Sequence, residues 1–343
     1  RATLLGNNAQ WFEDHLPVNN EFKKKETKAV LGLITDQVLG SGDVAPPALL
    51  GQNLPNPDWI RNQYGSKSSM FANIAGAYDE AAKETGVLKE FSYSNEVVER
   101  AKKFGLLSDS VHTDMHEILG HASGLMKPGV GEPSSIFKSY YNAFEETRAE
   151  LIALYYMLDP KLMELKIFPS VEAGKACYDN YITNGLMKQL GRMQLGQDLT
   201  EAHMQSRHLV ASWALEHGQK DNVIEKKVKD GKTYFVVNDY DKLRQLFGQL
   251  LSDVQRIKSE GDFDGAKNLV ETYAKHIDPV LHKEVKDRWA ALNVAPNMSF
   301  IQAKLVPEMK GDKIVDVKIE YPDDLTTQMM EYAEKYSFLP TYN

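Results

Sequence analysis

The sequence has little cysteine, no long apolar run and no excess of positive charge, and each shortage excludes a class of protein. Cys177 is the one cysteine among 343 residues, which excludes an intrachain disulfide and favours a reducing compartment. No apolar run approaches the roughly 18 residues that a membrane-spanning helix needs. The 48 acidic residues outnumber the 40 basic ones, and the net charge of −8 argues against nucleic acid as a partner. We therefore expect a cytoplasmic protein that binds neither nucleic acid nor membrane.

The chain also lacks an initiator Met and a basic-then-apolar leader, since it begins RATLLGNNAQWF. A mature end, a trimmed chain and an internal fragment all fit this start. Hydrophobic residues make up 42% and charged residues 26%, as in ordinary globular proteins. The length suits roughly two domains or one large domain.

Apolar periodicity predicts a mostly α-helical fold with small β additions. Residues 22–39 are expected to form a helix, with Phe22, Val30, Leu33, Ile34 and Val38 along one apolar face. Residues 40–65 are rich in Pro and Gly and are the most loop-like stretch. Further helices are expected over 70–85, 94–104, 109–126, 136–158, 171–190, 200–217, 240–260, 263–276, 280–293 and 323–336.

Two strand pairs interrupt the helical pattern. Residues 223–239 alternate between apolar and polar on both sides of Asp230-Gly231, which predicts a β-hairpin. A second pair is expected over 299–306 and 313–320, with its turn at 310–312. The expected fold class is therefore mostly α with small β-hairpin additions.

The segment His112-Thr-Asp-Met-His116-Glu117-Ile-Leu-Gly-His121 carries the chemistry. A His-Glu pair followed by a second His on a helix is the zincin arrangement, in which two imidazoles bind Zn²⁺ and the Glu takes a proton from water. The histidines of that motif are normally four residues apart, about 40° around the helix. His116 and His121 are five apart, about 140° on a regular helix, which is too wide for one metal ion.

This spacing either refutes the motif or requires a one-residue bulge of the π type, a turn found at functional sites. Gly120, directly before His121, is the residue that would most easily permit the distortion. A competing pair exists, because His112 and His116 have the regular spacing. That pair has no Glu directly after its first His, which makes it the weaker candidate.

A third ligand is expected from a later helix. The run AFEETRAELIALYYML contains Glu145, Glu146, Arg148 and Glu150 about 25 residues after His121. Glu146 and Glu150 share a helical face, so one can bind metal while the other steadies an imidazole. These acidic residues could instead lie at a helix N-terminus, where negative charge interacts favourably with the helix dipole. That alternative does not explain why they are accompanied by His116 and His121.

The segments HEILGH (116–121) and EETRAE (145–150) together resemble the paired signatures of the dipeptidyl peptidase III family, a family of zinc exopeptidases. Weaker similarities flank them at Asn53-Leu-Pro-Asn56 with Arg61, at His203-Met-Gln-Ser-Arg207 and at Gly261–Gly265. The likeness covers about residues 50–310. Members of that family are about twice as long as this chain and consist of a helical zinc-bearing lobe and a β-rich lobe around a cleft.

The resemblance implies one Zn²⁺ held by His116, His121 and Glu146, with Glu117 as the general base. It implies that Glu145 and Glu150 support the ligands and that His203 faces the cleft and assists catalysis. It further implies substrate contacts from the side chains of Arg207, Asn73 and Lys304.

The resemblance also implies an organisation and a function. Residues 1–65 would be a connecting helix and a Pro/Gly-rich segment partly belonging to the cleft or the other lobe. Residues 66–298 would be the helical catalytic lobe, and 299–343 a C-terminal strand pair and helix. The chain would be the C-terminal half of a metallopeptidase that removes dipeptides from short peptides, with a missing N-terminal lobe as partner. The alternatives are a non-catalytic peptide- or protein-binding helical module that retains a zinc site, and a metal-free helical scaffold.

Overall fold

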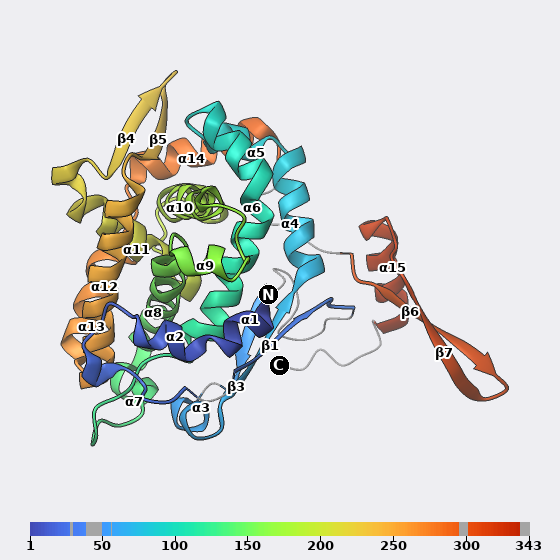
Figure 1. The fold of residues 1–343 in the computed structure, drawn as a ribbon. Helices are drawn as coiled ribbons and strands as arrows, with labels where there is room; N and C mark the ends of the chain where they lie inside the picture. Colours follow the sequence, from blue (N-terminus) through green and yellow to red (C-terminus); the bar gives the residue numbers. More distant parts are fainter. Residues whose placement is uncertain (28–29, 39–49, 56, 295–300, 337–343) are drawn as a thin grey trace.

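The computed structural model describes the chain except for residues 28–29, 39–49, 56, 295–300 and 337–343 (Figure 1). Helices dominate the described part, and its strands form one three-stranded sheet and two hairpins. The expectation of a mostly α fold with small β additions is confirmed. None of the helices in this part is long and apolar enough to cross a membrane.

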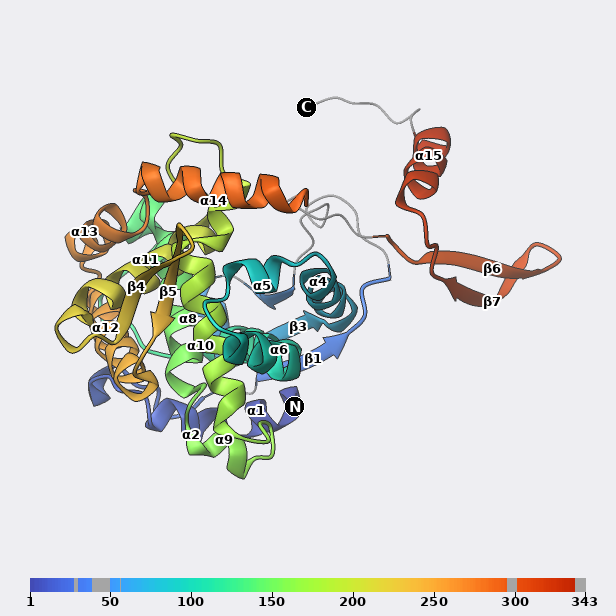
Figure 2. The ribbon, with the colours of Figure 1, turned by 90° about the horizontal axis from the view of Figure 1, so that it is seen from above.

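The helical body is built around one buried helix, α8 (Tyr141–Tyr156). Helices α11 (Ala202–His217) and α12 (Tyr240–Glu260) pack against it (Figures 1 and 2). Helix α10 (Val171–Leu186) packs against both α11 and α6 (Asn95–Met115). Nearly every residue of α8 from Ala143 to Leu154 is buried, including charged ones. Around these five helices lie α4 (Ala72–Glu84), α5 (Val87–Phe91), α7 (Pro133–Phe137), α9 (Pro160–Glu164), α13 (Phe263–Tyr273) and α14 (Pro279–Leu292).

Local sequence signals explain where several of these helices begin. The side chain of Ser94 accepts a hydrogen bond from the backbone N–H of Val97 at the start of α6. Asp239 and Asp262 cap α12 and α13 in the same way, which satisfies amides that have no partner within the helix. Most helices expected beyond residue 70 form with shifts at their ends. The two expected over 94–104 and 109–126 are instead one continuous helix, α6, which passes into a π-turn that ends at Gly120.

The hairpin expected over 223–239 is also confirmed. Strands β4 (Ile224–Lys229) and β5 (Lys232–Val237) pair antiparallel, with Lys229 opposite Lys232. Asp230 and Gly231 between them both have positive φ, as a two-residue turn of this kind requires.

The helix expected over 22–39 is wrong. Residues Val30–Thr35 form strand β1, which pairs parallel with β3 (Ser66–Phe71), and β2 (Gly51–Leu54) pairs antiparallel with β3. Gly32 explains part of this placement, because a Cβ there would lie 2.6 Å from the side chain of Ile118. Tertiary contact thus overrides the helical spacing. The loop-like stretch over 40–65 likewise contains β2 and α3 (Asp58–Tyr64).

Two short helices that the periodicity did not indicate open the chain. Helices α1 (Ala2–Asn7) and α2 (Ala9–Asp14) lie along the helical body, α1 beside β1, and Leu5 and Phe12 are buried in the core (Figure 1). Arg1 forms an ion pair with Asp114 of α6. The first residues therefore pack onto the element that carries His116.

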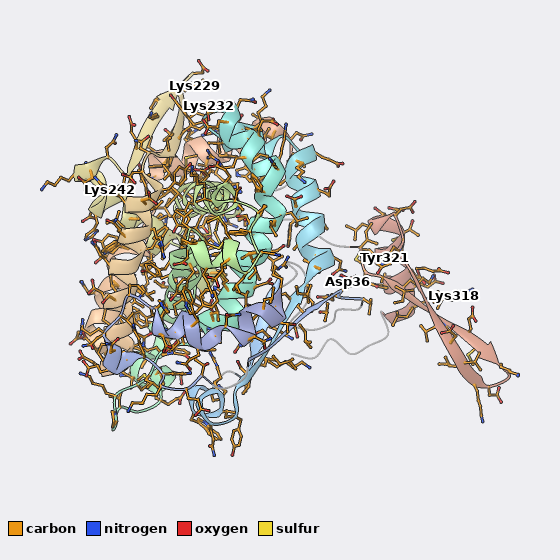
Figure 3. The ribbon with its side chains drawn as sticks, viewed as in Figure 1. Asp36, Lys229, Lys232, Lys242, Lys318 and Tyr321 are labelled. Atoms are coloured by element: carbon orange, nitrogen blue, oxygen red, sulfur yellow. The ribbon has the colours of Figure 1, made fainter. Side chains whose placement is uncertain are left out.

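The C-terminal segment forms an arm beside this body. Strands β6 (Lys304–Lys310) and β7 (Lys313–Glu320) pair antiparallel and are followed by α15 (Leu325–Tyr336). Both views show the arm projecting away from the helices, and Figure 3 shows Lys318 and Tyr321 on it, apart from the body. Every residue of β7 is exposed. The second strand pair is thus confirmed, with β6 starting later than expected.

Candidate metal centre

Helix α6 continues without a break into a π-turn over His116–Gly120. The backbone N–H of His121 donates to the carbonyl of His116 at 3.2 Å, which closes a turn one residue wider than that of an α-helix. The two imidazole rings consequently face the same region, with centroids 4.8 Å apart. The expected π-type bulge is confirmed.

Gly120 is required for packing against α8. A Cβ at this position would lie 2.9 Å from Cα and the carbonyl oxygen of Ala149, a distance that real Cβ atoms do not show. Its φ is not in the left-handed region. The sequence pointed to the right residue, but the reason is the close approach of two backbones and not conformational freedom.

Glu146 of α8 meets the two histidines. Nε2 of His116 lies 3.1 Å from Oε2 of Glu146, and Nε2 of His121 lies 3.9 Å from Oε1 of the same carboxylate. Ligand atoms of all three residues lie within 4.8 Å of one another. Among the described residues this is the single His/Cys/Asp/Glu group that could hold a metal ion. Two imidazoles and one carboxylate match the donor set of a catalytic zinc site.

The opposite ring nitrogens face two further carboxylates of α8. Nδ1 of His121 lies 3.3 Å from Oε1 of Glu145, and Nδ1 of His116 lies 3.7 Å from Oε1 of Glu150. Such carboxylates orient an imidazole and direct its other nitrogen toward a metal ion. Glu145 is itself held by Arg148 at 2.5 Å and Lys258 at 2.9 Å.

Electrostatics in the centre favour ionised carboxylates. Burial raises the pKa of Glu146, but the neighbouring His121, His116 and His203 outweigh it and lower that pKa to about 2. Burial lowers the pKa of His116, whereas Glu146 and Glu150 raise it, to about 9 overall. Burial also raises the pKa of Glu145, but Arg148 and Lys258 hold it well below its usual range. The centre therefore concentrates negative charge that suits a cation.

Buried carboxylate oxygens in the centre are a second observation that supports a metal ion there. Among the described residues, none donates a hydrogen bond to the buried Oε2 of Glu117. The buried Oε2 of Glu146 lies beside the rings of His116 and His203 without a hydrogen bond of normal geometry from the described residues. A buried carboxylate oxygen without a donor is costly unless a cation or water meets it. The competing histidine, His112, lies outside the group: its Nε2 lies 3.0 Å from Glu150, and its ring packs edge-on against Tyr181.

The structure places the other expected residues at different distances from this centre. Nε2 of His203 lies 3.5 Å from Oε2 of Glu146, while its Nδ1 lies 2.7 Å from Glu201. Arg207 donates to Gln189 at 3.1 Å and lies near enough to Glu150 to help lower its pKa. His203 therefore borders the centre, and Arg207 lies on the same helix one turn further on.

Asn73 and Lys304 are engaged elsewhere. Asn73 exchanges two hydrogen bonds with the backbone of Gln37, at 2.9 and 3.0 Å. Lys304 belongs to β6 in the projecting arm and pairs with Glu331 of α15 at 3.0 Å. The structure does not bring either residue into the metal-binding group, so their contact with substrate stays a prediction.

Three residues beside the centre had no assigned role in the sequence. Asn53 and Ser68 donate hydrogen bonds to the carbonyl of Glu117, both at 3.0 Å. Arg61 donates to the carbonyl of His121 at 3.2 Å. Asn53 and Arg61 lie in segments that resemble the family. Ser68 carries no signal, because a serine in a strand is ordinary.

Comparison with known proteins places the chain in a family. A sequence model of peptidase family M49 matches residues 126–336, which is more than half of the chain. The chain belongs to peptidase family M49. The M49 match begins at residue 126, so it includes Glu146 but neither His116 nor His121. The assignment of these two histidines therefore rests on the sequence motif and on the geometry of the structure.

Several curated proteins are similar to this chain in sequence. Human dipeptidyl peptidase 3 is 27% identical over 269 residues, covering 66% of this chain and 35% of the relative. Dipeptidyl peptidase 3 of Dictyostelium discoideum is 24% identical over 318 residues, covering 78% of this chain and 43% of the relative. Nudix hydrolase 3 of Arabidopsis thaliana is 26% identical over 286 residues, covering 81% of this chain and 34% of the relative. The matched part of the chain thus spans about a third to two fifths of the length of these curated relatives.

Solved structures share the fold. The structure of DPP III from Caldithrix abyssi matches with a TM-score of 0.65 at 22% identity and covers 84% of this chain and 52% of its own. Dipeptidyl-peptidase III from Corallococcus sp. strain EGB matches with a TM-score of 0.68 at 17% identity, and the match covers 86% of this chain and 51% of that structure.

Proposed function

We propose that this chain is the zinc-bearing half of a dipeptidyl peptidase III-like metallopeptidase that removes dipeptides from the amino end of short peptides. One observation supports it above all: a π-turn and α8 gather His116, His121 and Glu146 around one point, and a buried Glu117 follows the first ligand. Three protein ligands leave a position open, as in catalytic zinc sites, whereas a structural site has four.

In this proposal His116, His121 and Glu146 hold Zn²⁺. The zinc ion, when bound, polarises the scissile carbonyl and lowers the pKa of water toward about 7. Glu145 and Glu150 fix the orientation of the ligand imidazoles through their Nδ1 atoms. Arg148 and Lys258 keep Glu145 ionised, so it accepts the N–H of His121.

Glu117 moves the proton. Its Oε2 is buried and accepts no hydrogen bond from the residues that the structure describes, so it is available to take a proton from the attacking water. It then passes this proton to the leaving amine. His203, whose Nε2 lies 3.5 Å from Glu146, stands at the edge of the centre, where a hydrogen bond would stabilise negative charge on the scissile oxygen.

The remaining partner is the rest of the polypeptide. The two solved relatives are about twice as long as the part this chain matches. We propose that a second lobe, N-terminal to this chain, supplies much of the groove that holds the amino end of the peptide. A cytoplasmic location accords with the single buried cysteine, Cys177.

Glu117→Gln tests the proposal in a full-length protein that carries this chain. The amide keeps the shape of the side chain but cannot accept a proton, so we expect kcat on a dipeptidyl chromogenic substrate to fall by about 10²–10⁴-fold. Zinc content, measured by metal analysis, should stay at one ion per chain.

Near-normal turnover of this variant would refute the role of Glu117. An inactive wild-type protein with zinc and four protein ligands would favour the non-catalytic binding module instead. Assaying the 343-residue chain beside the full-length protein, both zinc-loaded, measures what the second lobe adds.

A further inference from the structure

The π-turn leaves one carbonyl without its helical donor. In a regular helix the carbonyl of Glu117 would accept the N–H of His121, four residues on. Here that N–H goes to His116 at 3.2 Å. A buried carbonyl without a donor costs free energy, so its other partners matter for the stability of the turn.

Two side chains from neighbouring strands take the place of the lost donor. Nδ2 of Asn53 and Oγ of Ser68 each lie 3.0 Å from the carbonyl oxygen of Glu117. The two residues are directly opposite each other in the β2–β3 ladder, and Asn53 also donates to Oγ of Ser68 at 2.8 Å. Ser68 is fully buried and Asn53 is 7% exposed. The two side chains are therefore part of the buried interface between the sheet and the turn, and not a contact at the protein surface.

The same strands contact the side chain of Glu117. A Cβ at Gly51, two residues before Asn53, would lie 3.2 Å from Cγ and 3.3 Å from Oε1 of Glu117. Arg61, which follows β2, donates to the carbonyl of His121 at the end of the turn. Asn53, Ser68 and Arg61 thus donate to carbonyls at both ends of the turn. Gly51 lies beside the Glu117 side chain on the same side.

We propose that Asn53 and Ser68 are positioning residues that keep the turn in its π conformation. Two states compete for one acceptor. In the π state the strands donate to the carbonyl of Glu117, and in the α state the N–H of His121 would do so. Rewinding to the α state would separate His116 and His121 by about 140°, so that one metal ion could not reach both. By occupying the carbonyl, the strand pair favours the state that binds metal and fixes Glu117 beside it.

Ser68→Ala tests this with Ser66→Ala as the matched control. Ser66 lies on the same strand, with its Oγ 3.0 Å from Nδ2 of Asn53. The two N–H groups of Asn53 are taken by Ser68 and the Glu117 carbonyl in the proposed state. Ser66 itself makes no hydrogen bond to that carbonyl in the part of the chain that the structure describes. In the 343-residue chain we expect Ser68→Ala to weaken zinc binding about tenfold in chelator competition, because loss of a group that supports a ligand typically costs 10–100-fold. Ser66→Ala should stay within about twofold of the unsubstituted chain.

A second readout separates positioning from a general loss of structure. In the full-length protein saturated with zinc, Ser68→Ala should lower kcat about tenfold and leave KM within about twofold, because a fully buried hydroxyl does not touch substrate. Zinc affinity within twofold of the unsubstituted chain, or equal loss in Ser66→Ala, would overturn the proposal. If circular dichroism shows that Ser68→Ala does not fold, Asn53→Ala with the same measurements decides.

The role of Glu117 in this inference depends on the proposed function, but the zinc measurement does not. Weakened zinc binding by Ser68→Ala together with a fully active Glu117→Gln protein would leave the positioning role standing and remove the general base. Unchanged zinc binding together with an inactive Glu117→Gln protein would do the reverse.

Discussion

His116, His121 and Glu146 could hold one metal ion because the two nitrogens of each ring face different carboxylates. The Nε2 atoms face Glu146, and the Nδ1 atoms face Glu150 and Glu145. His112, one helical turn before His116, instead directs Nε2 at Glu150. At the scale of single residues, the structure therefore places the two proposed ligand histidines together and His112 outside their group.

His121→Ala is expected to abolish stoichiometric zinc binding, because it removes one of three ligands. The control is His112→Ala, which should retain one zinc ion with weaker affinity, about 10–100-fold, since it removes a partner of Glu150. Metal analysis after dialysis distinguishes the two. Zinc retained in His121→Ala and lost in His112→Ala would favour the regularly spaced histidine pair instead.

Zinc affinity is expected to rise with pH. The carboxylates around His116 raise the pKa of its metal-free imidazole to about 9, and zinc binds only the neutral ring. Below pH 9 zinc must displace this proton, so affinity should increase about tenfold per pH unit and level off above it. Because the folded chain raises the pKa of His116 from 6.5 to about 9, the protonated ring stabilises the metal-free fold. This contribution to the free energy of unfolding should be lost as pH rises from 6.5 toward 9. Chelator competition between pH 6.5 and 9.5 measures the affinity, and a falling affinity would contradict the argument.

At the scale of elements, the π-turn and α8 are fitted to each other. Gly120 lets the turn approach Ala149 closely enough for Glu145 and Glu146 to reach the histidines. Helix α8 can hold these charges in the core because Arg148 and Lys258 neutralise Glu145 there.

Gly120→Ala is expected to destabilise the chain by about 1–3 kcal/mol, since the new methyl group would overlap the backbone of α8. Gly76→Ala in α4 is the control, because nothing lies within 4 Å of a Cβ there and Ala favours helix. It should leave the free energy of unfolding unchanged or raise it by up to about 1 kcal/mol. Urea unfolding measures both, and equal effects would show that the close approach at Gly120 is not decisive.

Local sequence predicts an element when that element carries its own signal. The five-residue spacing of His116 and His121 allows a shared metal ion only if the helix has a bulge, and Asp230-Gly231 specifies a hairpin by itself. Local sequence does not predict an element whose conformation is decided by a distant contact. Val30–Thr35 has helical spacing but pairs with β3, and Gly32 admits Ile118. Ser68 gained its position through β2 and the turn, which no local pattern reveals.

At the scale of the whole molecule, the helical body and the C-terminal arm differ in kind. The body buries α8 on all sides, whereas the arm exposes Leu305, Val317 and Ile319 on a two-stranded hairpin. A two-stranded hairpin is marginal in water unless another surface covers one face. Hydrogen bonds between Gln302 and Gln328 join α15 to the start of the hairpin. The division at about residue 299 stays a prediction that this contrast favours.

A chain ending at residue 294 is expected to unfold within about 2 °C of the complete chain, because the arm contributes little to the core of the body. It should also self-associate less, since exposed apolar strands promote association. Differential scanning calorimetry and light scattering at matched concentrations measure the two effects. A drop of more than about 5 °C would show that the arm stabilises the helices.

The extra residue in the turn also constrains which changes in chain length the site tolerates. Deleting one residue between Glu117 and His121 would restore the common four-residue histidine spacing and a regular helix. The shortened helix would then reclaim the Glu117 carbonyl, and the amide of Asn53 and the hydroxyl of Ser68 would lose their acceptor inside a closed interface. The two spacings are therefore not interchangeable by a single deletion. Passing from one to the other requires matched changes in two strands that lie 64 and 49 residues away in the sequence.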